Sequence, residues 1–117
     1  MKKIATLILV FAVAFTYAQE KSPVFEKAGD LVKATYFYED GSVKEQGFFK
    51  DKKLTGQWVQ FDQQGNKTMI AQYKEGNKVG RWFSLKGNLI KEINFQKNVI
   101  VSVKSIDRET VLALNND

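Results

Sequence analysis

Residues 38–61 read YEDGSVKEQGFFKDKKLTGQWVQF, and residues 62–85 read DQQGNKTMIAQYKEGNKVGRWFSL. The two stretches are copies of one pattern: a glycine in the fourth position, an aromatic residue and a lysine further on, and then Gly-x-Trp. Matching residues stand 24 positions apart, namely Gly41 and Gly65, Phe49 and Tyr73, Gly56 and Gly80, and Trp58 and Trp82. A fixed period of this length is typical of proteins built from stacked repeats.

Incomplete copies flank these two. Gly87 is followed by Phe95 at the same eight-residue spacing, but this third copy lacks Gly-x-Trp. Residues 32–37 form a degenerate half-repeat upstream, and residues 99–103 occupy the place of the last Gly-x-Trp strand. Degenerate ends are expected in a repeat array, because a terminal unit has only one neighbour.

Each copy carries the signals of a β-hairpin. Asp40-Gly41, Gln64-Gly65 and Gly87-Asn88 are turn dipeptides in which glycine supplies a positive φ, and the flanking segments are rich in β-branched and aromatic residues. We therefore predict an all-β fold, an antiparallel β-meander of hairpin repeats in a single sheet. Its six or seven strands are expected at about residues 31–39, 43–50, 56–62, 66–74, 79–85, 88–96 and 98–106.

Side-chain alternation assigns the two faces of this sheet. Counting in twos from each turn glycine gives a mainly apolar face that always ends in an aromatic residue: Val43, Glu45, Gly47, Phe49; Lys67, Met69, Ala71, Tyr73; and Leu89, Lys91, Ile93, Phe95. The residues between them, such as Lys44, Gln46, Thr68 and Gln72, predict a mixed and mostly polar opposite face.

The amino terminus has the parts of a cleavable signal peptide. Lys2 and Lys3 precede an apolar run over residues 4–15, which is too short to span a bilayer, and Ala18 offers a cleavage site. Removal of residues 1–18 lowers the formal charge from +5 to +3. The predicted organisation is a signal peptide at 1–18, a linker at 19–30, the repeat domain at 31–106 and a tail at 107–117.

The composition argues against common enzyme chemistry. The chain has no histidine and no cysteine, which removes the commonest general base and the commonest transition-metal ligands. Glu39, Asp40 and Asp62 stand at or beside predicted turns, where acidic residues are expected. A flat meander offers no cleft across which two carboxylates would face each other, and residues 62–66 lack the ligand pattern of a calcium loop. We expect no enzymatic activity, no cofactor and no metal site.

The repeat pattern resembles the MORN-repeat-variant family of bacterial β-hairpin repeats. The resemblance covers about residues 36–95 and is clearest in residues 38–41, residues 74–80 and the two Gly-x-Trp triplets. It implies an elongated single sheet with a binding or scaffolding role. Relatives often carry an antitoxin label, which export fits badly, or a nucleotidyltransferase label, which needs paired histidines. This chain departs from the pattern at Lys52, where the second copy has Gly76, and in its third copy.

The repeat signature is expected to be mainly structural. It comprises Gly41, Phe49, Gly56, Trp58, Gly65, Tyr73, Gly80, Trp82, Gly87 and Phe95. The two tryptophans allow a second interpretation, a flat platform for sugar rings or lipid headgroups. Their recurrence at the repeat period favours packing over the neighbouring hairpin, with Gly56 or Gly80 admitting close backbone approach.

Basic residues concentrate in the longer predicted loops. The candidate surface-binding residues are Lys50, Lys53, Lys74, Lys78 and Arg81. If the loops align along one edge, they form a positive stripe that attracts anionic lipid at about 1 kcal/mol per basic residue. The alternative, which we favour, is that the lysines keep loops soluble and edge strands unpaired. Asp51 and Glu75 lie in the same loops and weaken a stripe.

These observations predict an exported protein, periplasmic, secreted or on the cell surface, that acts as a protein-interaction or scaffolding module. The alternative is peripheral binding to anionic lipid or cell wall through the basic loops. Export and the small charge excess disfavour nucleic acid as a partner.

Overall fold

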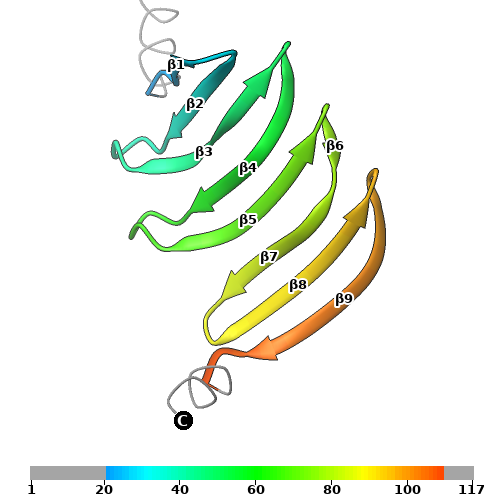
Figure 1. The fold of residues 1–117 in the computed structure, drawn as a ribbon. Coiled ribbons are helices and arrows are strands. Elements are labelled where there is room, and N and C mark those ends of the chain that lie inside the picture. Colours follow the sequence, from blue (N-terminus) through cyan, green and yellow to red (C-terminus); the bar gives the residue numbers. More distant parts are fainter. Residues whose placement is uncertain (1–20, 110–117) are drawn as a thin grey trace, which may run out of the picture.

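The computed structural model describes residues 21–109, which form one open antiparallel sheet (Figure 1). The predicted signal peptide and residues 110–117 of the predicted tail lie outside these residues. The nine strands are β1 Val24–Ala28, β2 Leu31–Phe37, β3 Val43–Lys50, β4 Lys53–Phe61, β5 Lys67–Lys74, β6 Asn77–Lys78, β7 Gly80–Lys86, β8 Leu89–Gln96 and β9 Val99–Asp107.

The strands follow one another across the sheet in chain order, and every pairing is antiparallel. The predicted all-β meander is therefore confirmed. Strands β6 and β7 together occupy the place that the single strand β4 has one repeat earlier, because Val79 interrupts the ladder between them.

The prediction missed the first strand. Residues 19–30 were expected to form a linker, but β1 pairs with β2 over five residues from Val24↔Thr35 to Ala28↔Leu31. The two strands meet at Gly29 and Asp30, and a φ of 66° at Gly29 supports the tight turn. The repeat signature does not extend this far upstream, so the 24-residue period gave no indication of the strand.

The turns alternate between the two margins of the sheet at which the strands begin and end; these margins are distinct from the edge strands β1 and β9. At the upper right edge in Figure 1 lie the two-residue turns 29–30, 51–52, 75–76 and 97–98, which we call the tight-turn edge. Asp51 and Lys52 both have positive φ, 50° and 65°, like Glu75 and Gly76 one repeat later. Lys52 thus adopts the left-handed conformation that its counterpart Gly76 adopts with less strain.

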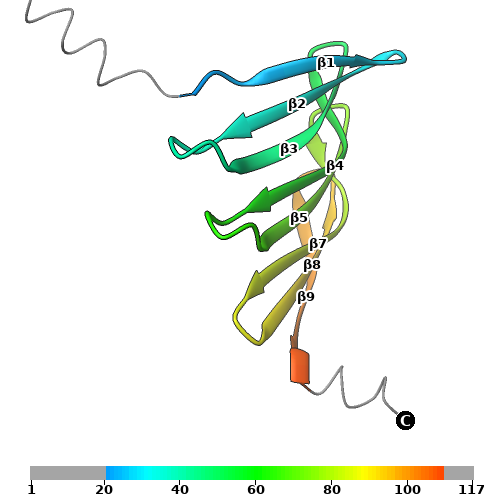
Figure 2. The ribbon, with the colours of Figure 1, turned by 90° about the vertical axis from the view of Figure 1, so that its left-hand side faces the viewer.

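The strands bend where the hairpin registers shift. Between β3 and β4 the register slips beside Gly56, and the same slip follows β5 beside Gly80. These glycines have φ of 66° and 68°, typical of a bulge residue. Bulges add bend and twist, and Figure 2 shows the outcome: β1 and β9 run at a wide angle to each other.

The core lies on one face only. The buried apolar side chains are Ala34, Trp58, Ala71, Trp82 and Phe95, and partly buried Phe49, Met69, Tyr73 and Ile93 pack against them. Six of these residues belong to the predicted apolar face, namely Phe49, Met69, Ala71, Tyr73, Ile93 and Phe95, so the alternation located the core face; Leu89, assigned to the same face, is 47% exposed. Residues 21–109 contain no helix with the length and hydropathy needed to cross a membrane.

Candidate functional site

A row of aromatic rings runs across the apolar face of the sheet, which we call the aromatic face. The centroids of neighbouring rings lie between 4.9 and 6.4 Å apart, and Tyr36 and Phe49 both contact Trp58. The row brings together every aromatic residue of the predicted repeat signature and extends it upstream by two rings: Phe25, Tyr36, Phe49, Trp58, Tyr73, Trp82 and Phe95. Four of the six ring pairs are edge-to-face, an arrangement that aromatic quadrupoles prefer, and the other two are tilted.

Both indoles are fixed in this row in the same way. Trp58 Nε1 donates a hydrogen bond of 3.0 Å to the Phe48 carbonyl, and Trp82 Nε1 donates one of 3.0 Å to the Gln72 carbonyl, 24 residues later. Only 3% of Trp58 and 8% of Trp82 is exposed. With their polar atoms paired and their rings covered, the indoles offer little surface to a sugar ring or a lipid headgroup.

The close approach beneath the first indole involves a different glycine from the one expected. A Cβ on Gly47 would lie 2.0 Å from Cδ2 of Trp58, whereas a Cβ on Gly56 would meet nothing within 4 Å. At Gly80 the nearest atom would be 3.8 Å away. The expectation that Gly56 and Gly80 admit close approach was therefore wrong; their role is the positive φ at the bend, and Gly47 makes room for the ring.

Three signature glycines lie at the strand ends opposite the tight-turn edge, away from the aromatic row: Gly41, Gly65 and Gly87. All three have positive φ. The first two close equivalent turns, in which their N–H groups donate to the carbonyls of Tyr38 and Asp62. They are therefore turn residues.

Acidic side chains near these turns hold the backbone. The Asp40 carboxylate accepts hydrogen bonds from the hydroxyl and the N–H of Ser42, and these bonds lower the pKa of Asp40 below its ordinary value of 3.8. Asp62 accepts from the N–H groups of Gln64 and Asn66. Within residues 21–109 no group of three or more potential metal-binding side chains comes together.

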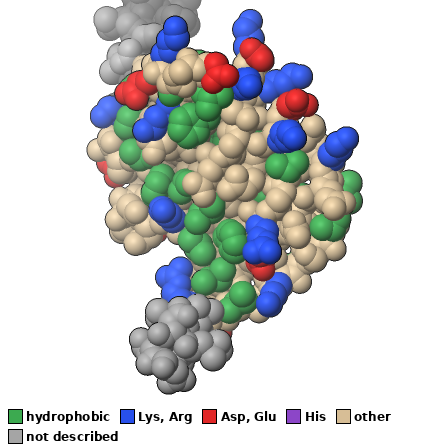
Figure 3. Space-filling view, in the orientation of Figure 1, with side chains coloured by type: hydrophobic (Ala, Val, Ile, Leu, Met, Phe, Trp, Pro, Cys, Tyr) green, Lys and Arg blue, Asp and Glu red, His purple; other side chains and the backbone are tan. Residues whose placement is uncertain are grey.

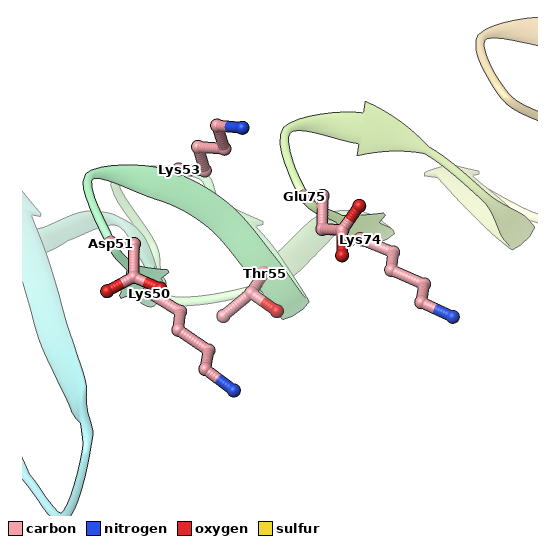
Figure 4. Close-up of a pocket in the computed structure, with 6 residues that line it drawn as sticks. All are labelled: Lys50, Asp51, Lys53, Thr55, Lys74 and Glu75. Carbon is pink, nitrogen blue, oxygen red and sulfur yellow. The ribbon is translucent and has the colours of Figure 1, made fainter.

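Three of the five predicted surface-binding residues lie around one groove at the tight-turn edge. Lys50, Lys53 and Lys74 line it together with Asp51, Thr55 and Glu75, around a volume of about 360 Å³ (Figure 4). Lys50 and Lys74 extend to the same side with Thr55 between them, while the Lys53 ammonium points away. Three lysines and two carboxylates leave a local formal charge of only +1, so the groove is weakly basic.

The other two candidates are placed elsewhere. Lys78 Nζ lies over the rings of Trp82 and Phe95, 5.3 and 5.5 Å from their centroids, and so belongs to the aromatic face. Arg81 Nε lies 3.4 Å from Glu92 Oε1, its partner across to β8. The five residues therefore do not form a single basic site, although Figure 3 shows basic side chains, mixed with acidic ones, along the upper right margin.

Adjacent turns on this edge are also bonded to the hairpin before them. The N–H of Gly76 donates to the Leu54 carbonyl over 2.9 Å, and the N–H of Asn98 donates to the Lys78 carbonyl over 2.9 Å. The Lys50 ammonium lies 3.6 Å from Asp30, in an exposed ion pair that stabilises little. The turns thus form an ordered row.

The most exposed apolar surface lies on β9, a strand that was predicted from the sequence but not as a binding surface. Along β9 the exposed fraction is 62% for Val99, 55% for Ile100, 49% for Val101 and 55% for Val103. Ile100 and Val103 pair with Phe95 and Ile93, so they extend the aromatic face to the last strand. The signal was present in the sequence, because residues 99–106 contain a single charged residue, Lys104.

The first strand mirrors the last. In β1, Phe25 is 56% exposed and its ring meets that of Tyr36 edge-on at 6.2 Å. The apolar row therefore ends in exposed side chains at both edges of the sheet. Comparison of the sequence with protein-family models gives no match, and comparison with curated proteins gives none either.

Proposed function

We propose that this chain is an exported, non-enzymatic repeat protein of the MORN-repeat-variant type that acts as a protein-interaction or scaffolding module in the cell envelope. The observation that carries the proposal is strand β9. It is the terminal strand of the sheet, and four of its apolar side chains are about half exposed or more.

An exposed edge strand recognises protein in a specific way. Its outward N–H and C=O groups pair with an added strand, while alternate side chains contact the partner. Proteins that keep such an edge free commonly protect it with charges, prolines or bulges. Along residues 99–106 there is no proline and only Lys104 provides a charge, and the one irregularity is the register shift at Val101, so residues 102–106 are suited to pairing.

The proposed export and the proposed lack of enzymatic activity are supported by the sequence. The lysine-led apolar segment at residues 4–15 supports export, and the lack of histidine and cysteine supports a binding role. The row of hairpins also gives such a module a rigid, extendable frame, because each repeat packs on its neighbours.

A photo-crosslinking residue placed at position 103 tests the proposal in the native envelope. We expect an adduct of defined mass from Val103, and none from a matched control at Gln63, which is exposed at the turn between β4 and β5. A protein adduct lost on adding Val101→Lys would support recognition through the edge. Irradiation that yields no protein adduct at position 103 would contradict it.

A second candidate is attachment to anionic lipid through the tight-turn edge. The observation in its favour is the grouping of Lys50, Lys53 and Lys74 around one groove. Asp51 and Glu75 in the same groove count against it. Sedimentation with anionic vesicles should fall with salt and with the double change Lys53→Glu and Lys74→Glu if this candidate holds, since lipid attraction is electrostatic.

A further inference from the structure

We propose that the partner of β9 is a second copy of this chain, which adds its strand β1 so that the sheet continues head to tail. The inference rests on the proposed function, that β9 is a recognition edge. Pairing between two copies of this chain requires no other component of the cell envelope.

Strand direction allows this pairing. Seven antiparallel pairings separate β1 from β9 along the path β1–β2–β3–β4–β5–β7–β8–β9. An odd number of reversals makes β9 run opposite to β1. A copy placed in continuation of the sheet therefore presents its β1 antiparallel to β9, as at every internal junction.

The kinds of strand also match. Within the array, the second strand of a hairpin is always followed by the first strand of the next: β2 pairs with β3, β4 with β5, and β7 with β8. Strand β9 is the second strand of the last hairpin, and β1 is the first strand of the first hairpin. The junction β9–β1 therefore repeats an arrangement that the chain already uses three times.

The register is set by a row of directly opposed residues on the aromatic face. The first part of the row joins Phe25, Ala34 and Gly47, and the last part joins Trp82, Ile93 and Val103. Its interior residues are covered, but its two ends are not: Phe25 is 56% and Val103 is 55% exposed. Continuation of the row places Val103 directly opposite Phe25 of the next copy and covers both.

Charges on the other face fit the same register. If Val103 opposes Phe25 in antiparallel strands, Lys104 opposes Val24 and stands diagonal to Glu26 of the next copy. Diagonal positions of an antiparallel pair are within reach of long side chains, and opposite charges there are favourable. Both Lys104 and Glu26 are exposed in the single chain.

Head-to-tail pairing is heterologous, so each end of an assembly keeps one free edge, and copies add in series unless the rotation between them closes a ring. This property gives a sharp test by sedimentation velocity on the exported protein. We expect wild type to form a concentration-dependent series of oligomers. Val103→Lys and Phe25→Lys should each be monomeric, and their equimolar mixture should form dimers and nothing larger, because each variant retains the edge that the other lacks.

The alternative arrangement, two β9 strands paired about a two-fold axis, gives a different result. Phe25→Lys alone would then dimerise, and the mixture would contain no additional species. Either that result or a monomeric wild type up to about 100 µM, well above the Kd of a specific complex, would overturn the inference. Both positions are more than half exposed, and circular dichroism checks that the variants fold.

Cysteine cross-linking supplies a second measurement that does not depend on lysine substitutions. The chain contains no cysteine, so Val103→Cys and Phe25→Cys introduce single thiols. Opposed residues on paired strands have Cα atoms about 4.5–5.5 Å apart, within the range of a disulfide. Oxidation should link the two variants when mixed and neither variant to itself. A photo-adduct of Val103 with another protein, together with no disulfide here, would keep the proposed function and reject the second copy.

Discussion

The central hairpins and the last strand pair share one backbone plan but differ in what covers it. In the centre, the bend carries Gly-x-Trp, and the indole lies over the small residue of the preceding strand; Trp58 is 3% exposed. At the end, β9 has no Gly-x-Trp, and its register with β8 shifts only between Asn94 and Phe95. Val103 stands in the corresponding part of the strand and is 55% exposed.

The difference separates two tasks within one repeat. A single-layer sheet cannot bury side chains against a second layer, so each central repeat stabilises itself by folding an indole back over its own strands. The last strand, β9, leaves its part of the same face exposed and its edge free. Stability is therefore expected to reside in the central tryptophan units, and recognition at the ends.

Removal of the first indole should have the largest effect. Trp58→Ala deletes a buried ring that contacts Tyr36, Phe49 and Tyr73, and it should lower the free energy of unfolding by about 3–5 kcal/mol. Val103→Ala, at the exposed end, should change it by less than about 1 kcal/mol. Urea unfolding followed by circular dichroism, at low protein concentration, measures both.

Trp58→Phe serves as the control, because it keeps an aromatic ring and loses the hydrogen bond to the Phe48 carbonyl. It should fall between wild type and Trp58→Ala. Equal losses from Trp58→Ala and Val103→Ala would refute the division between a stabilising centre and a recognition end.

The next effect concerns the residue beneath each indole. Gly47 lies under Trp58, whereas the second unit has Ala71 in the equivalent position. An added Cβ at Gly47 overlaps the indole, so Gly47→Ala should cost about 1–3 kcal/mol of unfolding free energy. In a Trp58→Ala background the same change should be neutral or stabilising, because alanine is favoured over glycine within a strand.

A double-mutant cycle measures this coupling. If Gly47→Ala lowers the free energy of unfolding equally with and without the indole, glycine is needed at position 47 for its backbone conformation and not to make room for Trp58. The two central units would then not differ as proposed. A ring shift that accommodates alanine, as at Ala71, would appear as a small cost in the single variant.

Much of this architecture could be predicted because the repeat period fixes equivalent positions. Gly41 and Gly65 predicted turns, and alternation from them predicted the face that holds Phe49 and Tyr73. What could not be predicted depends on interactions without a sequence signature. Strand β1 has no repeat motif, and the bend at Gly56 is seen only in the register of the sheet.

The candidate sites were less predictable than the fold. Lys50, Lys53 and Lys74 gather around one groove, as loop alignment suggested, but Lys78 turns to the aromatic face. The direction of a lysine beside a bulge depends on a local change of register, which composition and spacing do not encode. The scarcity of charge along residues 99–106 marks β9 as apolar, but that nothing covers the strand follows from its position at the end of the sheet, a tertiary property.

The smallest expected effect is a pH dependence in the centre. Tyr73 lies between the two indoles, and burial, with a smaller contribution from the charge of Glu45, raises its pKa above the ordinary value of 10.0. A raised folded-state pKa means that the unfolded chain ionises first. The stability due to the neutral phenol is thus fully present below about pH 10 and is lost as pH rises through the folded pKa. The urea midpoint should fall above pH 10, and Tyr73→Phe should reduce that fall. If the urea midpoint of Tyr73→Phe falls as much as that of wild type, groups other than Tyr73 cause the loss of stability at alkaline pH.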